Sequence, residues 1–261
     1  MTDTPMRWTR PGPGAAVLAL ATLAACGGEG APPPAAQVSA PASATSAAPG
    51  AGPEDAGPAA LDPALLLPVD ERAALMAAQV TAGAALARMG APEDAAGHLR
   101  LALSEVKPGG LARLVENGLE PDLFDAAAEA LDTGAPPEEV ELKLVAVEAN
   151  IARLRETAGG DPAGLVGVLT KRCLNAYREG VSLDNTIANR IEYQDAYGYA
   201  VIAQDLAAQL EGDAASDVQL ELKMLVLMWP AEGPVPGDPP APLMTFASQV
   251  NRVDLALSAL Q

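Results

Sequence analysis

The sequence predicts an all-α protein, a single bundle of about eight helices that follows a signal peptide and a disordered tether. Three observations lead to this fold class. Apolar residues recur at helical spacing from Asp62 onward, and no alternating segment rich in Val, Ile and Thr indicates a strand. Aromatic residues make up only 3% of the chain, so the core must be built from small and aliphatic side chains, which favour close-packed helices.

The first 25 residues are typical of a secretory signal. Arg7 and Arg10 make a basic start, and the apolar stretch 15–23 follows. This stretch is shorter than the roughly 20 apolar residues that span a bilayer. The segment 23–26, Leu-Ala-Ala-Cys, closely resembles the lipobox of bacterial lipoproteins. The resemblance implies that the thiol of Cys26 receives a lipid and that the chain is cleaved just before this residue.

The same resemblance implies a location and a membrane contact. In lipoproteins an Asp directly after the lipidated cysteine retains the protein in the inner membrane, whereas Gly27 follows Cys26 here. We therefore expect lipid anchoring on the periplasmic side of the outer membrane of a Gram-negative cell. The start codon stays open between Met1 and Met6, because the second would give a more typical basic start.

A tether and one domain are expected after the signal. The segment 26–61 is crowded with Ala, Pro and Gly and has too little apolar surface to offset the entropy cost of ordering. As a flexible coil it would span roughly 30–35 Å. The helical periodicity that follows predicts a single domain over 62–261.

Two helices open this domain. Asp70 is the expected N-cap of the first, which Gly90 ends, and Pro92 starts the second, which runs to about Val106. The pair resembles a single tetratricopeptide-type hairpin, and because stable repeats need several stacked units, a generic hairpin is the more common alternative. The resemblance rests on Ala82, Gly83, Leu86, Ala95, Leu99, Ala102 and Pro108.

The middle of the chain carries four more helical patterns. We expect helices over 111–117, 121–131, 138–157 and 162–177. Gly159 and Gly160 close the third of these, and Asp161 caps the fourth. Cys173 falls on the inward face, where a cysteine behaves as a small buried hydrophobe.

Residues 186–210 form the most informative helical pattern, because three of the four tyrosines lie there. A polar stripe of Glu192, Asp195 and Tyr199 runs beside an apolar seam on this helix. The seam consists of Ile187, Ile191, Gly198, Ile202 and Leu206.

Two further helices complete the bundle. The segment 218–229 is apolar nearly all round, which predicts the buried centre of the bundle. An irregular and exposed proline-rich linker over 230–242 follows it. The last helix must dock onto the bundle, because its apolar face needs cover. This face consists of Phe246, Val250, Val253, Leu257 and Leu260.

The charge of the chain limits its partners. The formal charge is −18, and an acidic protein without clustered Lys and Arg does not bind nucleic acid by counterion release. Cationic or neutral partners are expected instead. Cys26 and Cys173 are the two cysteines, and we expect no disulfide because Cys26 carries the lipid.

One hypothesis for a site is a metal centre. His98 and Glu105 lie two turns apart on one helix, and Glu192 and Asp195 form a similar pair on another. If the two helices met, these four side chains would suit a divalent metal such as iron, manganese or zinc. The alternative is an ordinary solvated acidic surface.

The helical periplasmic layout is loosely similar to imelysin-like proteins, some of which carry a Gly-x-His-x-x-Glu motif. Here Gly97 and His98 are adjacent, and Leu101 stands where the glutamate would be. The similarity is therefore one of architecture, and it implies no ligand for this chain.

A second hypothesis concerns the tyrosines. Tyr193, Tyr197 and Tyr199, with Tyr177, would line a ligand or partner surface, or would serve helix packing. No nucleophile, phosphate loop or paired-cysteine motif accompanies His98, so we expect no enzyme. The sequence favours a lipid-anchored, non-enzymatic binding module with an envelope protein as partner, and the alternative is a periplasmic metal-binding protein.

Overall fold

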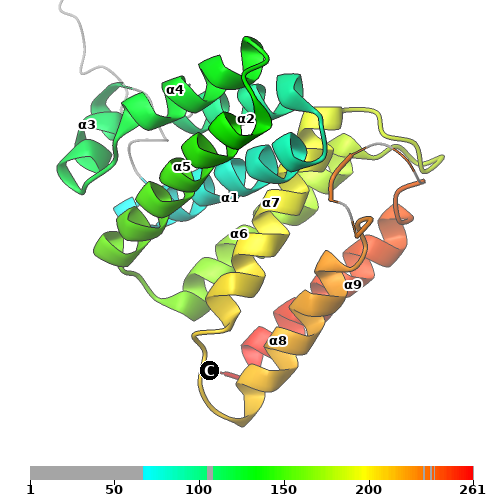
Figure 1. Cartoon of the computed structure of the whole chain (residues 1–261). Coiled ribbons are helices and arrows are strands. Elements are labelled where there is room, and N and C mark those ends of the chain that lie inside the picture. The colour runs from blue at the N-terminus through cyan, green and yellow to red at the C-terminus, as the bar shows by residue number, and fades with distance from the viewer. Residues whose placement is uncertain (1–66, 105–107, 232, 236, 238, 261) are drawn as a thin grey trace, which may run out of the picture. The chain divides into compact units, whose positions relative to one another are not determined.

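A computed structural model describes residues 67–104, 108–231, 233–235, 237 and 239–260 (Figure 1). Within these residues the regular structure is helical, and the extended backbone pairs at a single antiparallel bridge between Val181 and Ile187. The predicted all-α fold class is confirmed. The signal 1–25 and the tether 26–61, with Cys26, lie outside the described residues.

Nine helices occupy this part of the chain. Five consecutive helices, α2 to α6, begin at a proline, whose missing N–H and fixed φ suit the first turn of a helix. The helices are α1 (Val69–Arg88), α2 (Pro92–Ser104), α3 (Pro108–Glu116), α4 (Pro121–Asp132), α5 (Pro137–Ala158), α6 (Pro162–Gly180), α7 (Arg190–Ala207), α8 (Asp213–Val226) and α9 (Leu243–Ser258).

The ends of the helices follow the predicted signals in most places. The Asp161 carboxylate accepts hydrogen bonds from the backbone N–H groups of Ala163 and Gly164 and so caps α6 as predicted. Gly159 and Gly160 end α5 with φ values of 64° and 107°, which glycine adopts without steric cost. The predicted cap of α1 was wrong, because Asp70 lies inside the first turn and Pro68 precedes the helix.

The helices α1 and α7 pack directly on each other within the bundle. In addition α1 packs against α2, α5 and α6, and α7 packs against α6 and α8. The approach is close, because a Cβ added at Gly198 of α7 would overlap the carbonyl oxygen of Ala78 in α1. Small side chains at the contact allow this separation. The buried alanines of α1 are Ala73, Ala74, Ala77, Ala78, Ala82 and Ala84.

Three further helices, α4, α8 and α9, pack around this arrangement on two sides. On one side α4 packs against both α2 and α5. On the other, α8 and α9 lie side by side, and they pack against α7 and α6 respectively (Figure 1). The predicted docking of the last helix is confirmed, because Phe246, Val250 and Val253 are buried.

An aromatic cluster holds the α8–α9 pair onto α6 and α7. The rings of Tyr177 and Phe246 stack with centroids 3.5 Å apart, and Trp229 meets both rings edge-on. The hydroxyl of Tyr177 donates a 2.7 Å hydrogen bond to the carbonyl of Ala241 in the proline-rich linker. The linker was predicted to be exposed, but these contacts hold it against the bundle and Pro240 is buried.

The predictions for the helix over 186–210 need three corrections. The helix begins at Arg190, where the Asn189 side chain caps it, and Ile187 instead pairs with Val181 in the bridge. The predicted polar stripe faces inward, since Asp195 is 6% exposed and Tyr199 is buried. The predicted apolar seam is also wrong at one end, because the side chain of Ile191 is 53% exposed.

The predicted buried centre was also wrong. The helix α8 lies beside α9 and α7, and it leaves one apolar face in contact with solvent. The centre is occupied by α1 and α7 instead, because their small residues allow the closest approach. Cys173 is buried on α6 as predicted.

Two glycine substitutions test the importance of the α1–α7 contact. Replacing Gly198 by Ala is expected to destabilise the protein by about 1–3 kcal/mol, because the new Cβ forces α1 and α7 apart. Replacing Gly97 by Ala is the matched control. A Cβ there meets nothing within 4 Å, so this change should stabilise the protein by about 0.4–1 kcal/mol. Urea unfolding measures both, and a Gly198→Ala variant as stable as the wild type would contradict the packing argument.

Candidate functional site

The side chain of His98 lies buried between three helices. It projects from α2, is 2% exposed, and meets residues of α1 and α7. Its Nδ1 atom is 2.8 Å from Oε1 of Gln79 in α1 and 3.2 Å from Oδ1 of Asp195 in α7. Its Nε2 atom is 3.0 Å from Oε1 of Gln194 in α7. Both ring nitrogens therefore face oxygen atoms.

Polar contacts continue from His98 to the surface. The Nε2 amide of Gln194 donates to Oδ2 of Asp94 at 3.1 Å, and the other carboxylate oxygen of Asp94 pairs with Arg190 at 2.8 Å. Asp94 belongs to the first turn of α2 and Arg190 begins α7, so the contacts join the starts of these two helices. We call this set the His98 network. It consists of Gln79, Asp94, His98, Arg190, Gln194 and Asp195.

Of the four predicted metal ligands, the structure brings His98 and Asp195 together. Glu192 lies one turn before Asp195, and burial, then the charges of Asp195 and Glu179, raise its pKa. Glu105 lies outside the described residues. Within the described part of the chain no three His, Cys, Asp or Glu side chains form a group suited to a metal. The metal hypothesis, which includes Glu105, stays a prediction.

The structure separates the predicted tyrosine surface into two parts. The rings of Tyr193 and Tyr197 lie 6.0 and 5.7 Å from the ring of Trp229, so they belong to the aromatic cluster with Tyr177. Tyr199 is buried on a different face of α7, since it follows Tyr197 by two residues. Tyr197 is only half-buried, and it lines an open cleft.

Arg88 forms an ion-pair cluster beside that cleft. It is the last residue of α1, and its guanidinium group makes a two-bond contact with Glu141 of α5 at 2.8 and 3.2 Å. Two more bonds of 2.8 and 2.9 Å reach Glu148. These bonds lower the pKa of Glu141 and raise that of Arg88. Arg88 also lines a second cleft, between α1, α4 and α5.

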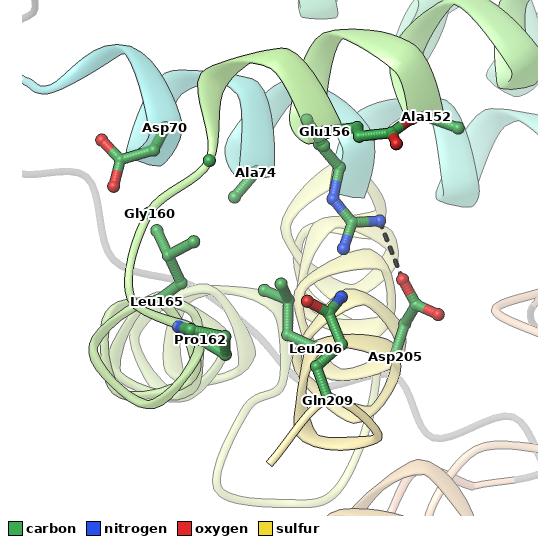
Figure 2. Close-up of a pocket in the computed structure, with 12 residues that line it drawn as sticks. Asp70, Ala74, Ala152, Glu156, Gly160, Pro162, Leu165, Asp205, Leu206 and Gln209 are labelled. Carbon is green, nitrogen blue, oxygen red and sulfur yellow. Dashed lines mark hydrogen bonds and ion pairs between the residues drawn. The ribbon is translucent and has the colours of Figure 1, made fainter.

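A separate cleft of about 390 Å³ opens where α1, α5, α6 and α7 meet (Figure 2). Figure 2 shows Ala74, Leu165 and Leu206 reaching this cleft from three of these helices. A guanidinium–carboxylate pair joins Arg155 to Asp205 at 2.8 Å across it. The polar lining consists of Asp70, Arg155, Glu156, Asp205 and Gln209. One of the three carboxylates, Asp205, is already paired with Arg155, so Asp70 and Glu156 beside an apolar floor are the groups that would suit a positively charged group on an apolar stem.

The outward face of α8 carries an apolar stripe. Leu220, Met224 and Leu227 are 55%, 49% and 65% exposed, and their spacing of four and three residues aligns them along one face. We call these three residues the α8 stripe. The opposite face packs into the bundle through Ala215, Val218, Leu222 and Leu225.

Sequence reasoning missed both the cleft and the stripe. The cleft lining comes from residues as far apart as Asp70 and Gln209, and no local pattern joins them. The stripe is the apolar outer half of the segment 218–229, for which the sequence predicts burial, but its three residues are exposed. A helix that is apolar all round therefore has a second explanation besides burial in its own bundle: one of its faces binds another protein.

Comparisons with known proteins give no relative from which a function can be transferred. No protein-family model matches the chain, and neither a curated protein nor a solved structure does. The resemblances to lipoproteins, to imelysin-like proteins and to a tetratricopeptide-type hairpin therefore stay predictions. Among the described helices, none combines the length and the apolar character needed to cross a membrane.

The Arg88 cluster predicts a pH-dependent contribution to stability. Replacing Arg88 by Met should cost about 1 kcal/mol at pH 7, since these partly exposed ion pairs contribute modestly. A lowered carboxyl pKa stabilises the fold above the ordinary pKa, and this contribution is lost as the pH falls through the lowered value. The difference between wild type and Arg88→Met should therefore shrink below about pH 4.5, the ordinary value for Glu141.

Urea unfolding at pH 7 and pH 3 measures this difference. Lys143→Met is the matched control, because Lys143 pairs at 3.6 Å with Glu139 on the same helix, α5. Such a pair contributes only about 0.3–0.5 kcal/mol. An Arg88→Met effect of equal size at both pH values would show that the Glu141 and Glu148 contacts do not stabilise the fold.

Proposed function

We propose that the chain is a lipid-anchored, non-enzymatic interaction module of the cell envelope, and that it binds a protein partner through the α8 stripe. The Leu-Ala-Ala-Cys segment ending at Cys26 and the composition of 26–61 support the anchor. The α8 stripe is the observation that carries the binding part of the proposal.

The arrangement of α8 supports a protein contact. Single exposed apolar residues are common on soluble proteins and need no explanation. Here Leu220, Met224 and Leu227 form one continuous ridge on a helix whose other face is already buried. Larger continuous apolar surface is typical of protein-binding sites. Met224 at the centre adds an adaptable side chain that packs against varied partners.

The geometry of the stripe indicates how a partner would bind. Its residues are spaced by four and three positions, the spacing at which one helix packs along another. A partner with an apolar groove or a helix with its own apolar face would cover the stripe. The high negative charge of the chain favours a partner that is basic or neutral over one that is acidic.

Photo-crosslinking in the native cell tests this binding surface. A photoreactive phenylalanine derivative at position 224 of the full chain is expected to give a discrete adduct with another protein. The same derivative at Glu129, an exposed polar position on α4, is the control and should give none. Adding Leu220→Glu should lower the yield about tenfold, which corresponds to about 1.4 kcal/mol of lost contact.

Each outcome of that experiment has one meaning. Leu220 is more than half exposed, so Leu220→Glu should leave the melting temperature of the chain unchanged. If the adduct at position 224 survives this substitution, or is no stronger than at Glu129, the α8 stripe is not the binding surface. Mass spectrometry of the adduct then identifies the crosslinked partner as either a different protein or a second copy of this chain.

Replacement of Cys26 tests the anchor. Cys26→Ser is expected to abolish metabolic labelling with palmitate and to release the chain from the membrane fraction, since the hydroxyl does not replace the thiol in lipid transfer. Cys173→Ser is the matched control, because Cys173 is fully buried and donates to the carbonyl of Ala196 at 3.2 Å, a bond that serine preserves. Palmitate labelling that persists in Cys26→Ser would show that Cys26 does not carry the lipid anchor.

A further inference from the structure

Two carboxylates continue the α8 stripe toward the start of its helix. Asp213 and Asp217 are exposed, and their spacing from Leu220 places both on the same outward face as the stripe. We call Asp213 and Asp217 the α8 acidic pair. The outward face of α8 therefore has an acidic half and an apolar half, which together extend about 21 Å from Asp213 to Leu227 at the rise of an α-helix.

The α8 acidic pair has no partner within the part of the chain that the structure describes. Neither Asp213 nor Asp217 makes an ion pair or a side-chain hydrogen bond there. An acid in the first turn of a helix stabilises the helix dipole, and this role accounts for Asp213. Asp217 lies beyond the first turn, so the dipole does not account for its position.

The two other charged residues of α8 already have roles in the fold. The carboxylate of Glu221 accepts a 2.7 Å hydrogen bond from Nε2 of Gln249 in α9. Lys223 is exposed beside Met224 and lies in the last turn of α8, where a cation stabilises the end of a helix. Unpaired negative charge is therefore concentrated at the end of the outward face that precedes the α8 stripe.

We infer that the partner of the α8 stripe is a basic amphipathic helix of another envelope protein. The apolar face of that helix covers Leu220, Met224 and Leu227, and its Lys or Arg side chains reach the α8 acidic pair. This inference rests on the proposed function, in which the α8 stripe is the binding surface. Amphipathic helices bind through apolar anchors about one turn apart, which is the spacing of the stripe. Cations one or two turns beyond such anchors would lie opposite Asp217 and Asp213.

The α8 acidic pair disfavours the other surfaces that would cover an apolar ridge. An anionic membrane surface would repel both carboxylates. A second copy of the chain would bring a further formal charge of −18, which opposes association. A neutral apolar groove would cover the stripe but would leave the two carboxylates without a partner. A basic helix is complementary to both halves of the face, and such complementarity speeds association and selects the partner.

Mapping of the crosslink at position 224 tests the kind of segment that binds. The adduct of the full chain is isolated from the native cell and digested, and the attached partner peptide is sequenced by mass spectrometry. We expect apolar residues at helical spacing in this peptide, with Lys or Arg within one or two turns of them. A peptide of this same chain, or one without cations or helical spacing, would overturn the inference but would leave the α8 stripe as the binding surface. The absence of any adduct would overturn both the inference and the proposed function.

A double substitution then tests the charge contact. Asp213→Asn with Asp217→Asn removes both charges with little change of shape, and it should lower the yield of the adduct roughly three- to tenfold, the effect of two solvent-exposed ion pairs. Asp122→Asn with Asp125→Asn on α4 is the matched control and should leave the yield unchanged. These two acids are also exposed, one in the first turn of a helix and one beyond it. An equal loss in both variants would show an effect of net charge alone, and no loss in either would show that no cation of the partner lies on the α8 acidic pair. Each of these two results would overturn the inference.

Discussion

The close contact between α1 and α7, where Gly198 meets the backbone of Ala78, sets the geometry of the described bundle. A chain with few aromatic residues has few large side chains to fill a wide core, so its helices must approach closely to exclude water. Alanines on α1 and a glycine on α7 permit that approach. The large aromatic side chains gather at another place, around Trp229, where they attach α9 to α6 and α7.

The His98 network depends on the same contact. Gln79 is the residue after Ala78, and Gln194 and Asp195 lie about one turn before Gly198 on α7. Short amide and carboxylate side chains reach a common histidine only because the two backbones are already close at this point. The polar network therefore needs no separate cavity. It lies at the edge of this close apolar contact, where a low local dielectric strengthens each interaction and makes each missing partner costly.

The sequence predicted the helices well and the surroundings of polar residues poorly. Caps such as Asp161 and closing glycines such as Gly159 act locally, so their effect is readable from neighbouring residues. Asp195 was placed on a polar face because carboxylates are usually solvated. The side chain that contacts it, His98, lies far away in the sequence, and only the fold brings the two together. The sequence nevertheless placed both residues in one predicted set of four metal ligands, because the chain has a single histidine.

The incorrect prediction that α8 is the buried centre has the same cause, because the sequence does not show what surrounds a helix. The periodicity of a sequence shows which faces of a helix are apolar. It does not show whether an apolar face is buried by the same chain or by another protein. Exposing Leu220, Met224 and Leu227 carries a risk of aggregation. A formal charge of −18 opposes self-association by repulsion between copies. An apolar ridge on a strongly acidic chain therefore favours contact with a different, less acidic partner over contact with itself, and this selectivity is consistent with an interaction module.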